Sequence, residues 1–162
     1  MVTYVIPYRV VGKTRLGDSG LAEAMMSDVL AACEAAGEVV VAAEPGGQGE
    51  AVGRALSEQT GPVTIVNSDL PCATPTELRE LTAAAPAVAP ARDGTTNAIS
   101  LPDAREFVPL YGPGSADRFV VALQATPLEL PGLRDDVDTW DDLERVRDRV
   151  GPNTRTYLED RA

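Results

Sequence analysis

A four-residue run of β-prone side chains, Val63–Val66, is the feature that most constrains how this chain can fold. The run predicts a short strand buried on both faces, as in the middle of an α/β sheet. Asp69 then falls just beyond the carboxyl end of this strand, the edge where ligands bind in open α/β sheets. A helix start follows, with Thr74 as N-cap and Glu77 completing a capping box. The alternative role for Asp69 is to shape the intervening turn.

Short strands and helices alternate along the rest of the chain. Further strands are predicted over residues 2–6, 39–42, 86–90, 97–101 and 126–130. Helices are predicted over residues 21–36, 50–59, 75–84, 116–124 and 140–150. This alternation favours an α/β fold in one domain over residues 1–150, with a mixed, mostly parallel sheet and helices on both faces. Residues 151–162 are predicted to form a polar tail that packs loosely.

Charge excludes some classes of partner. The 162 residues carry 25 acids and 14 bases, a net charge of −11, which disfavours binding to nucleic acid or to an anionic membrane. No apolar run approaches the roughly 18 residues of a membrane span, so we expect a cytoplasmic protein. Such an acidic, lysine-poor surface is typical of a protein from a high-salt cytoplasm. A GC-rich genome is the alternative explanation for the use of arginine in place of lysine. The sequence does not determine the oligomeric state, and a homodimer is compatible with it.

The loop after the first strand contains the only lysine of the chain, in the run Gly12-Lys13-Thr14-Arg15. Glycine allows the backbone to bend close to a ligand, and two cations within three residues suit a polyphosphate. The spacing is not that of a P-loop, because no glycine precedes Gly12. A solvated basic loop is the alternative.

A second acidic site is Asp136-Val137-Asp138. Two carboxylates at positions i and i+2 of an extended segment point to the same side, which suits joint binding of a hard divalent cation. The acidic start of a helix is the alternative. Pairing with Asp69 strengthens the first interpretation, since phosphoryl-transfer sites draw carboxylates from separate strand ends.

Two further segments offer groups for a small anionic substrate. The first supplies a cation and neutral hydrogen-bonding groups, from Arg92, Thr95, Thr96 and Asn97. A hairpin turn built on Asp93-Gly94 is compatible with this interpretation.

The second segment, Tyr111–Ser115, predicts an anion seat formed by backbone amides and Ser115 at a helix start, with Gly112 in the loop and Arg118 one turn on. A glycine-rich loop that includes Gly47 and Gln48 could lie against a base or ribose.

Six collinear motifs between residues 2 and 150 resemble the guanylyltransferases of deazaflavin-coenzyme (F-420) biosynthesis, the 2-phospho-L-lactate and phosphoenolpyruvate guanylyltransferases. The motifs are Ile6-Pro7, Lys13–Leu16, Asn67–Pro71, Arg92–Ala98, Tyr111–Ser115 and Asp136–Thr139. The resemblance implies a Rossmann-like nucleotidyltransferase fold related to that of the molybdenum-cofactor guanylyltransferases. One loop departs from the family, since it reads Gly47-Gln48-Gly49 where Gly-Leu-Asn is usual.

The resemblance also implies a reaction, in which GMP passes from GTP to the phosphate of a three-carbon phospho-acid and pyrophosphate is released with Mg²⁺. It implies Asp69, Asp136 and Asp138 as magnesium ligands. Lys13 and Arg15 fall in the triphosphate loop. Contacts to the phospho-acid are implied at Thr96, Gly112 and Ser115. The alternatives are a molybdenum-cofactor or sugar-phosphate nucleotidyltransferase, and a module that binds GTP without turnover.

Overall fold

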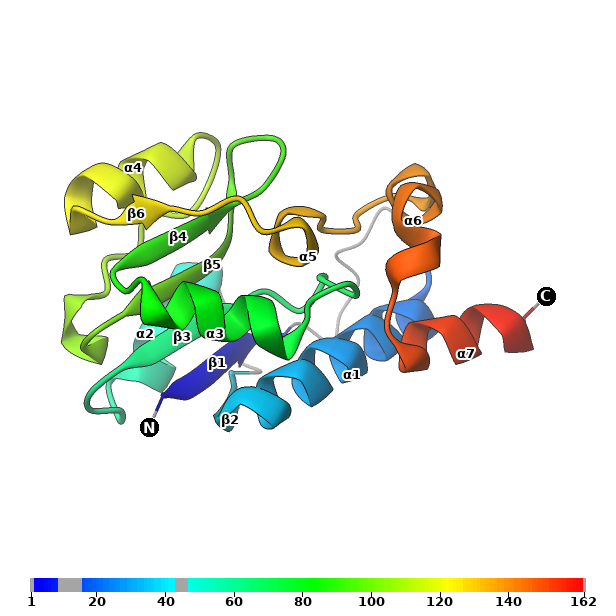
Figure 1. The fold of residues 1–162 in the computed structure, drawn as a ribbon, viewed down its shortest axis with the longest axis horizontal. Helices are drawn as coiled ribbons and strands as arrows, with labels where there is room; N and C mark the ends of the chain where they lie inside the picture. Colours follow the sequence, from blue (N-terminus) through cyan, green and yellow to red (C-terminus); the bar gives the residue numbers. More distant parts are fainter. Residues whose placement is uncertain (1, 9–15, 43–46, 162) are drawn as a thin grey trace.

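The protein is described here by a computed structural model that covers residues 2–8, 16–42 and 47–161, and these residues contain one six-stranded sheet (Figure 1). The strands are β1 Thr3–Pro7, β2 Glu38–Ala42, β3 Val63–Val66, β4 Ala87–Pro90, β5 Thr96–Leu101 and β6 Thr126–Pro127. The α-helices are α1 Ser19–Ala36, α2 Gln48–Leu56, α3 Pro75–Ala83, α4 Ser115–Leu123, α5 Pro131–Arg134, α6 Trp140–Val146 and α7 Pro152–Asp160. Two 3₁₀ turns are η1 Ala104–Glu106 and η2 Arg147–Arg149. None of the described helices is both long and apolar enough to cross a bilayer.

The sheet is mixed, with strand order β2-β1-β3-β5-β4-β6. The pairs β1–β2, β1–β3 and β4–β6 are parallel, and the pairs β3–β5 and β4–β5 are antiparallel. The predicted mixed, mostly parallel sheet is therefore confirmed. Because β5 runs against β3, it begins at the edge where β3 ends, and the pair Val66–Ala98 marks that edge.

Helices cover both faces of the sheet, as predicted. Alternating residues of β1 separate to the two faces, with Tyr4 and Ile6 on one and Val5 on the other. The first face packs against α1, α3 and α5, and the second packs against α2 and α4, where Phe119 is fully buried. The buried strand Val63–Val66 is confirmed as a central element, since every residue in it is buried.

A third apolar cluster lies beyond the end of the sheet and joins α1, α6 and α7 (Figure 1). It contains Leu21 and Met25 of α1, Leu143 of α6 and Leu158 of α7. Val137, from the segment between α5 and α6, is fully buried in the same cluster. This cluster therefore fixes the acidic segment 136–138 against the rest of the molecule.

The C-terminal segment contradicts our prediction of a loosely packed tail. Residues Pro152–Asp160 form α7, which lies alongside α1, with Thr154 and Leu158 buried (Figure 1). The carboxylate of Asp28 in α1 accepts hydrogen bonds of 2.9 Å from the backbone N–H groups of Asn153 and Thr154. Asp28 thus caps α7 although it lies 125 residues earlier in the chain. A pattern among neighbouring residues cannot reveal a contact between segments so far apart in the sequence.

Two other predicted elements are shorter than expected. The predicted strand 126–130 is reduced to the two residues of β6, because Pro127 has no N–H and Pro131 begins α5. The predicted helix 140–150 is α-helical only to Val146 and then tightens into η2.

Candidate metal centre

Three carboxylates converge at the carboxyl end of β3. One oxygen from each of Asp69, Asp136 and Asp138 lies within 4.8 Å of the others. Asp69 stands in the turn after β3, and its carbonyl oxygen accepts a hydrogen bond of 2.9 Å from the backbone N–H of Val137. This bond holds the turn beside the segment that carries the other two aspartates.

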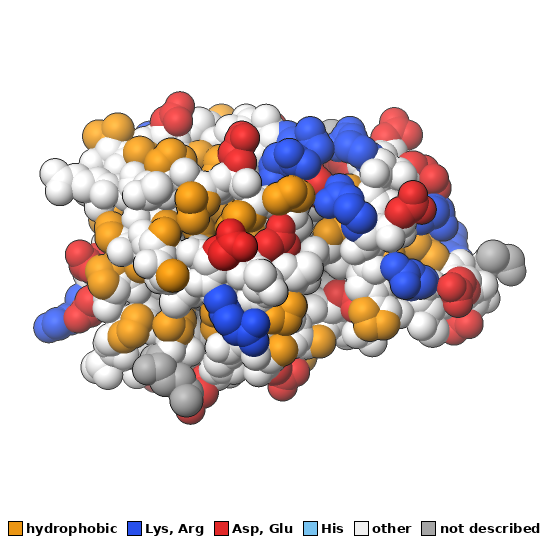
Figure 2. All heavy atoms as spheres, in the orientation of Figure 1, with side chains coloured by type: hydrophobic (Ala, Val, Ile, Leu, Met, Phe, Trp, Pro, Cys, Tyr) orange, Lys and Arg blue, Asp and Glu red, His pale blue; other side chains and the backbone are white. Residues whose placement is uncertain are grey.

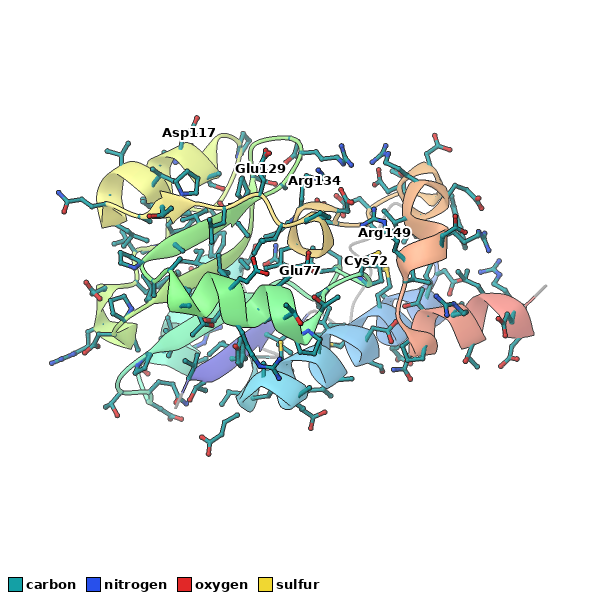
Figure 3. All side chains as sticks on the ribbon, viewed as in Figure 1. Cys72, Glu77, Asp117, Glu129, Arg134 and Arg149 are labelled. Carbon is teal, nitrogen blue, oxygen red and sulfur yellow. The ribbon has the colours of Figure 1, made fainter. Side chains whose placement is uncertain are left out.

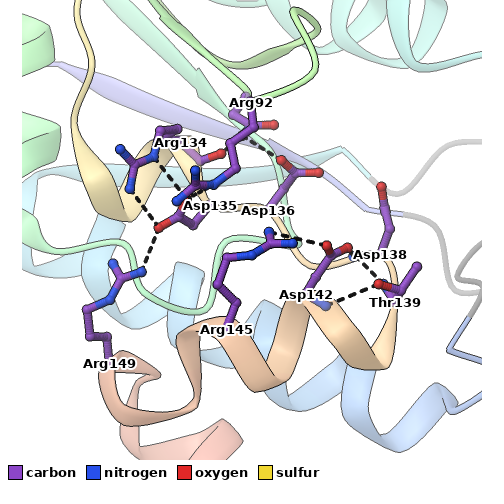
Figure 4. Close-up of polar contacts among 10 residues, drawn as sticks. Arg92, Arg134, Asp135, Asp136, Asp138, Thr139, Asp142, Arg145 and Arg149 are labelled. Carbon is purple, nitrogen blue, oxygen red and sulfur yellow. Dashed lines mark hydrogen bonds and ion pairs between the residues drawn. The ribbon is translucent and has the colours of Figure 1, made fainter.

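Asp136 and Asp138 point to one side because Val137, between them, is buried in the opposite direction. The segment is fixed at its far end by a capping box on α6, formed by Thr139 and Asp142. The Asp142 carboxylate also accepts a hydrogen bond of 3.0 Å from the backbone N–H of Asp138 (Figure 4). We predicted that these aspartates follow a strand, whereas they follow the short helix α5.

The electrostatic environment of Asp136 favours a cation bound beside it. Burial raises the pKa of Asp136, a hydrogen bond of 3.1 Å from the Asn97 amide opposes this, and the negative charge of Asp138 raises the pKa further. The folded protein therefore disfavours the negative charge of Asp136. Carboxylate oxygens in this number suit a hard divalent cation such as Mg²⁺, so the residues fit the metal that the resemblance implies.

Amide side chains connect the start of α2 to this centre. Gln48, the first residue of α2, donates from Nε2 to Oδ1 of Asn67 over 2.6 Å. Asn67 in turn donates to the carbonyl oxygen of Thr96 over 3.0 Å. The predicted nucleotide-binding residue Gln48 is thus linked to the turn that holds Asp69, and its neighbour Gly47 is exposed.

Asn97, predicted to bind substrate, lies in β5 and is 3% exposed. Its Nδ2 contacts the Asp136 carboxylate and the carbonyl oxygen of Arg134, each over 3.1 Å. The amide therefore positions one of the three carboxylates.

The turn between β4 and β5 is the hairpin that the sequence allowed. Gly94 has a positive φ of 85°, which favours glycine. The carboxylate of Asp93 accepts hydrogen bonds from the backbone N–H and the hydroxyl of Thr95, over 3.0 and 2.6 Å. The Thr95 hydroxyl, predicted to bind substrate, is thus part of the turn.

The loop before α4 is held by Arg118. Its guanidinium donates to the carbonyl oxygens of Pro113 and Leu110, over 2.6 and 2.9 Å. Gly112 in this loop has a φ of 121°, where any other residue would be strained. Arg118, predicted to bind substrate, therefore acts on the shape of the loop.

Thr96 and Ser115 meet across the end of the sheet. Their hydroxyl oxygens lie 2.7 Å apart, and the residues are 3% and 0% exposed. The bond joins β5 to the first residue of α4. The two residues predicted to contact the phospho-acid are thus neighbours, and their contact with substrate stays a prediction.

Sequence reasoning missed a group of three arginines on the buried carboxylate of Asp135 (Figure 4). Arg92 Nε lies 2.7 Å and Arg134 Nε 3.0 Å from Asp135 Oδ1, and Arg149 donates to Oδ2 over 2.6 Å. Burial acts to raise the pKa of Asp135, but the hydrogen bonds from the arginines outweigh it and hold that pKa well below its usual value. Among the three arginines, only Arg92 had been predicted as a site residue.

The helix α5 packs closely against Cys72 in the loop after β3 and against Glu77 of α3, two residues labelled with Arg134 in Figure 3. Arg134 and Asp135 lie at the end of this helix. The Glu77 carboxylate accepts a hydrogen bond of 2.8 Å from the backbone N–H of Gly132. A side chain at Gly132 would collide with Glu77 and with the backbone of Cys72. Glycine is therefore required here for reasons of space.

Gly12, Lys13 and Arg15 lie outside the described residues, so the predicted triphosphate loop stays a prediction from the sequence.

Comparisons with solved structures show which fold the chain shares. The chain shares the fold of a presumed nucleotide-diphospho-sugar transferase from Desulfovibrio desulfuricans G20, with a TM-score of 0.74, 17% identity and coverage of 98% of this chain and 94% of that one. A protein from Mycobacterium tuberculosis H37Rv matches with a TM-score of 0.53 and 20% identity, over 90% of this chain and 96% of that one. The predicted nucleotidyltransferase-like α/β fold is confirmed.

Comparisons of sequence are more specific. The chain is 42% identical over 102 residues to the phosphoenolpyruvate guanylyltransferase of Nocardia farcinica, an alignment that covers 59% of this chain and 45% of that protein. It is 29% identical over 185 residues to the 2-phospho-L-lactate guanylyltransferase of Methanoregula boonei, covering 96% of this chain and 86% of that protein. The match thus spans less than half of the Nocardia relative. No protein-family model matches the chain. The predicted resemblance to the guanylyltransferases is confirmed.

Proposed function

We propose that the protein transfers GMP from GTP to the phosphate of a three-carbon phospho-acid, either 2-phospho-L-lactate or phosphoenolpyruvate. An oxygen of the acceptor phosphate bonds to the α-phosphorus of GTP, and the bond between that phosphorus and pyrophosphate breaks. We place this reaction in the biosynthesis of the deazaflavin coenzyme F-420, in the cytoplasm. The acceptor phosphate is already ionised, so the reaction requires positioning and charge neutralisation rather than a side-chain base.

The convergence of Asp69, Asp136 and Asp138 within 4.8 Å is the observation that carries the proposal. The similarity to two named guanylyltransferases supports the choice of GTP and phospho-acid as substrates. The three aspartates would hold Mg²⁺, which when bound supplies positive charge to the phosphates.

The remaining residues take positions around this centre in the proposal. Asn97 orients the Asp136 carboxylate through its bond of 3.1 Å. Lys13 and Arg15 would neutralise the triphosphate. The backbone around Gly112 and the start of α4 at Ser115 would receive an anionic group of the acceptor.

The test is release of pyrophosphate from GTP in the presence of 2-phospholactate, phosphoenolpyruvate or 3-phosphoglycerate, with Mg²⁺ or with EDTA. We expect release with one of the first two acids and Mg²⁺, and none with EDTA. Asp69→Asn should abolish release and retain the fold. The matched control is Asp141→Asn, because Asp141 is an exposed acid on the neighbouring α6.

Two other outcomes would replace the proposal. Release only with a sugar phosphate or a molybdopterin acceptor would assign the protein to another kind of nucleotidyltransferase. Binding of GTP without release for any acceptor would indicate a module that binds GTP without turnover.

A further inference from the structure

The side-chain amide of Gln48 is held in one orientation by a chain of hydrogen bonds. The carbonyl oxygen of Thr96 can only accept, so the nitrogen of the Asn67 amide must face it, over 3.0 Å. The Asn67 oxygen is then turned towards Gln48, whose Nε2 donates to it over 2.6 Å. The Oε1 atom of Gln48 is therefore an acceptor turned away from Asn67, and no hydrogen bond from the described residues reaches it.

Two rings pack against the backbone next to this amide. A Cβ atom at Gly49 would lie 2.9 Å from the Cβ of Pro109 and 3.8 Å from the Cδ2 of Tyr111. Pro109 is exposed, and both Tyr111 and Gln48 are partly exposed. The start of α2 thus combines apolar ring surfaces with one acceptor of fixed direction, which are the features that a planar base with N–H donors requires.

The amide stands at a position where the related guanylyltransferases differ from this chain. Where Gly-Leu-Asn is usual, the chain has Gly47-Gln48-Gly49, so the amide comes one position earlier. The distance of 2.9 Å to Pro109 leaves no room for a side chain at position 49. The chain therefore carries its amide at position 48, where Asn67 fixes its orientation.

The position of Gln48 suits the base of a nucleotide whose phosphates lie at the aspartate centre. Gln48 begins α2, the helix that follows β2, and Asp69 follows the carboxyl end of β3, which runs in the same direction. One hydrogen bond joins Gln48 to Asn67, two residues before Asp69. The ribose separates a base from its α-phosphate, so a base site belongs near the centre but not in it. A neutral base also has no need of the basic side chains that gather around α5 and α6 in Figure 2.

We propose that Oε1 of Gln48 selects guanine, by accepting a hydrogen bond from the edge of the base that carries N1–H and the 2-amino group. This inference rests on the proposed function. Adenine has an unprotonated N1 and a C–H on the same edge, so the oxygen would face a lone pair and find no N–H donor. A freely turning amide would offer its NH₂ group to adenine instead, and the contact with Asn67 prevents this.

The experiment compares GTP with ATP in the release of pyrophosphate. We expect wild type to prefer GTP by at least about tenfold in kcat/KM, the effect of leaving a polar group unpaired. Gln48→Leu, which introduces the residue usual in the related enzymes, should reduce this preference towards one because it removes the acceptor. Gln48→Met should act in the same way and serves as the second variant if the first fails to fold. A purely structural role for Gln48 would lower kcat/KM for both nucleotides alike and leave their ratio unchanged.

The matched control is Gln59→Leu. Gln59 is a partly exposed glutamine in the turn after α2, beyond the opposite end of that helix. This variant should keep the full preference for GTP. An unchanged preference in Gln48→Leu and Gln48→Met would overturn the inference, as would a wild type that uses GTP and ATP equally well.

A calorimetric titration with GTP and with ATP separates failure of the inference from failure of the proposed function. If wild type releases no pyrophosphate from either nucleotide with any acceptor, the proposed function fails. Tighter binding of GTP than of ATP by wild type, lost in Gln48→Leu, would still support the role of Gln48. Equal binding of the two nucleotides by wild type, or binding of neither, would overturn it.

Discussion

At Asp136, the proposed reaction requires an ionised carboxylate, whereas the fold would be more stable with a neutral side chain. Burial and the charge of Asp138 raise its pKa, so the folded protein disfavours the ionised form that is present at pH 7. Asp136→Asn removes that charge and retains an oxygen for the Asn97 amide. We expect the variant to melt at a higher temperature than wild type in EDTA, by about 2–4 °C per kcal/mol gained. Thermal unfolding at pH 7 measures this.

The same variant should not respond to magnesium. Added Mg²⁺ stabilises whichever protein binds it, in proportion to the logarithm of its concentration over its Kd. Wild type and the control Asp141→Asn should therefore melt at higher temperature with Mg²⁺, whereas Asp136→Asn should not. A lower melting temperature for Asp136→Asn in EDTA would show that the carboxylate mainly stabilises the fold.

Lys13 is the second residue for which a sharp effect is expected. It is the only lysine of the chain, and its loop follows β1. An ammonium group that neutralises the triphosphate contributes about 3–4 kcal/mol to the transition state in comparable sites. Lys13→Ala should lose about 100-fold or more in kcat/KM on that scale, with an unchanged melting temperature. Turnover within about threefold of wild type would mean that the loop is a solvated turn.

At the scale of elements, Asp135 ties the turn after β4, the end of α5 and η2 into one unit. Its depressed pKa means that the ion pairs stabilise the fold above the unfolded-state pKa of about 3.9 and are lost as the pH falls towards the lower folded-state value. Asp135→Asn should cost about 2 kcal/mol at pH 7, a modest value for a buried carboxylate because its partners are partly exposed. Denaturant unfolding at several pH values measures this. The difference from wild type should shrink below about pH 4, and a constant difference would contradict the prediction.

The docking of α7 depends on one carboxylate. Asp28 is 6% exposed and accepts hydrogen bonds from Asn153 and Thr154 at the start of α7. Asp28→Ala leaves those N–H groups without their acceptor and should cost about 1–3 kcal/mol. Urea unfolding checks this, with the exposed Asp160→Ala as control. Equal stability of Asp28→Ala and wild type would show that apolar packing alone holds the helix.

Elements with local signals could be predicted from the sequence, and those that depend on distant partners could not. The capping box of Thr74 and Glu77 and the buried strand Val63–Val66 are both present, because each depends on neighbouring residues. The helix α7 was missed because its cap, Asp28, lies in α1.

The candidate site follows the same rule. Asp69 and the Asp136-x-Asp138 pair could be picked out, since each follows a local pattern, and the structure brings them together. The arginines on Asp135 could not, because Arg134 and Arg149 come from separate segments that only the folded chain unites.

At the scale of the whole molecule, the net charge of −11 produces repulsion between like charges on the surface. Salt shortens the reach of this repulsion to about 3 Å at 1 M. If the charge is an adaptation to high salt, the melting temperature should rise between dilute buffer and molar potassium chloride. A flat or falling melting temperature would leave the net negative charge without an explanation.

The antiparallel pair β3–β5 divides the sheet by chain order, with β2-β1-β3 from the first part of the chain and β5-β4-β6 from the second. Asp69 belongs to the first part, and Asp136 and Asp138 belong to the second. Neither part of the sheet holds all three carboxylates, so a cation bound by the three would hold the two parts together. A chain cut between α3 and β4 would therefore behave as a split reporter, silent as two fragments and active only when they reassemble.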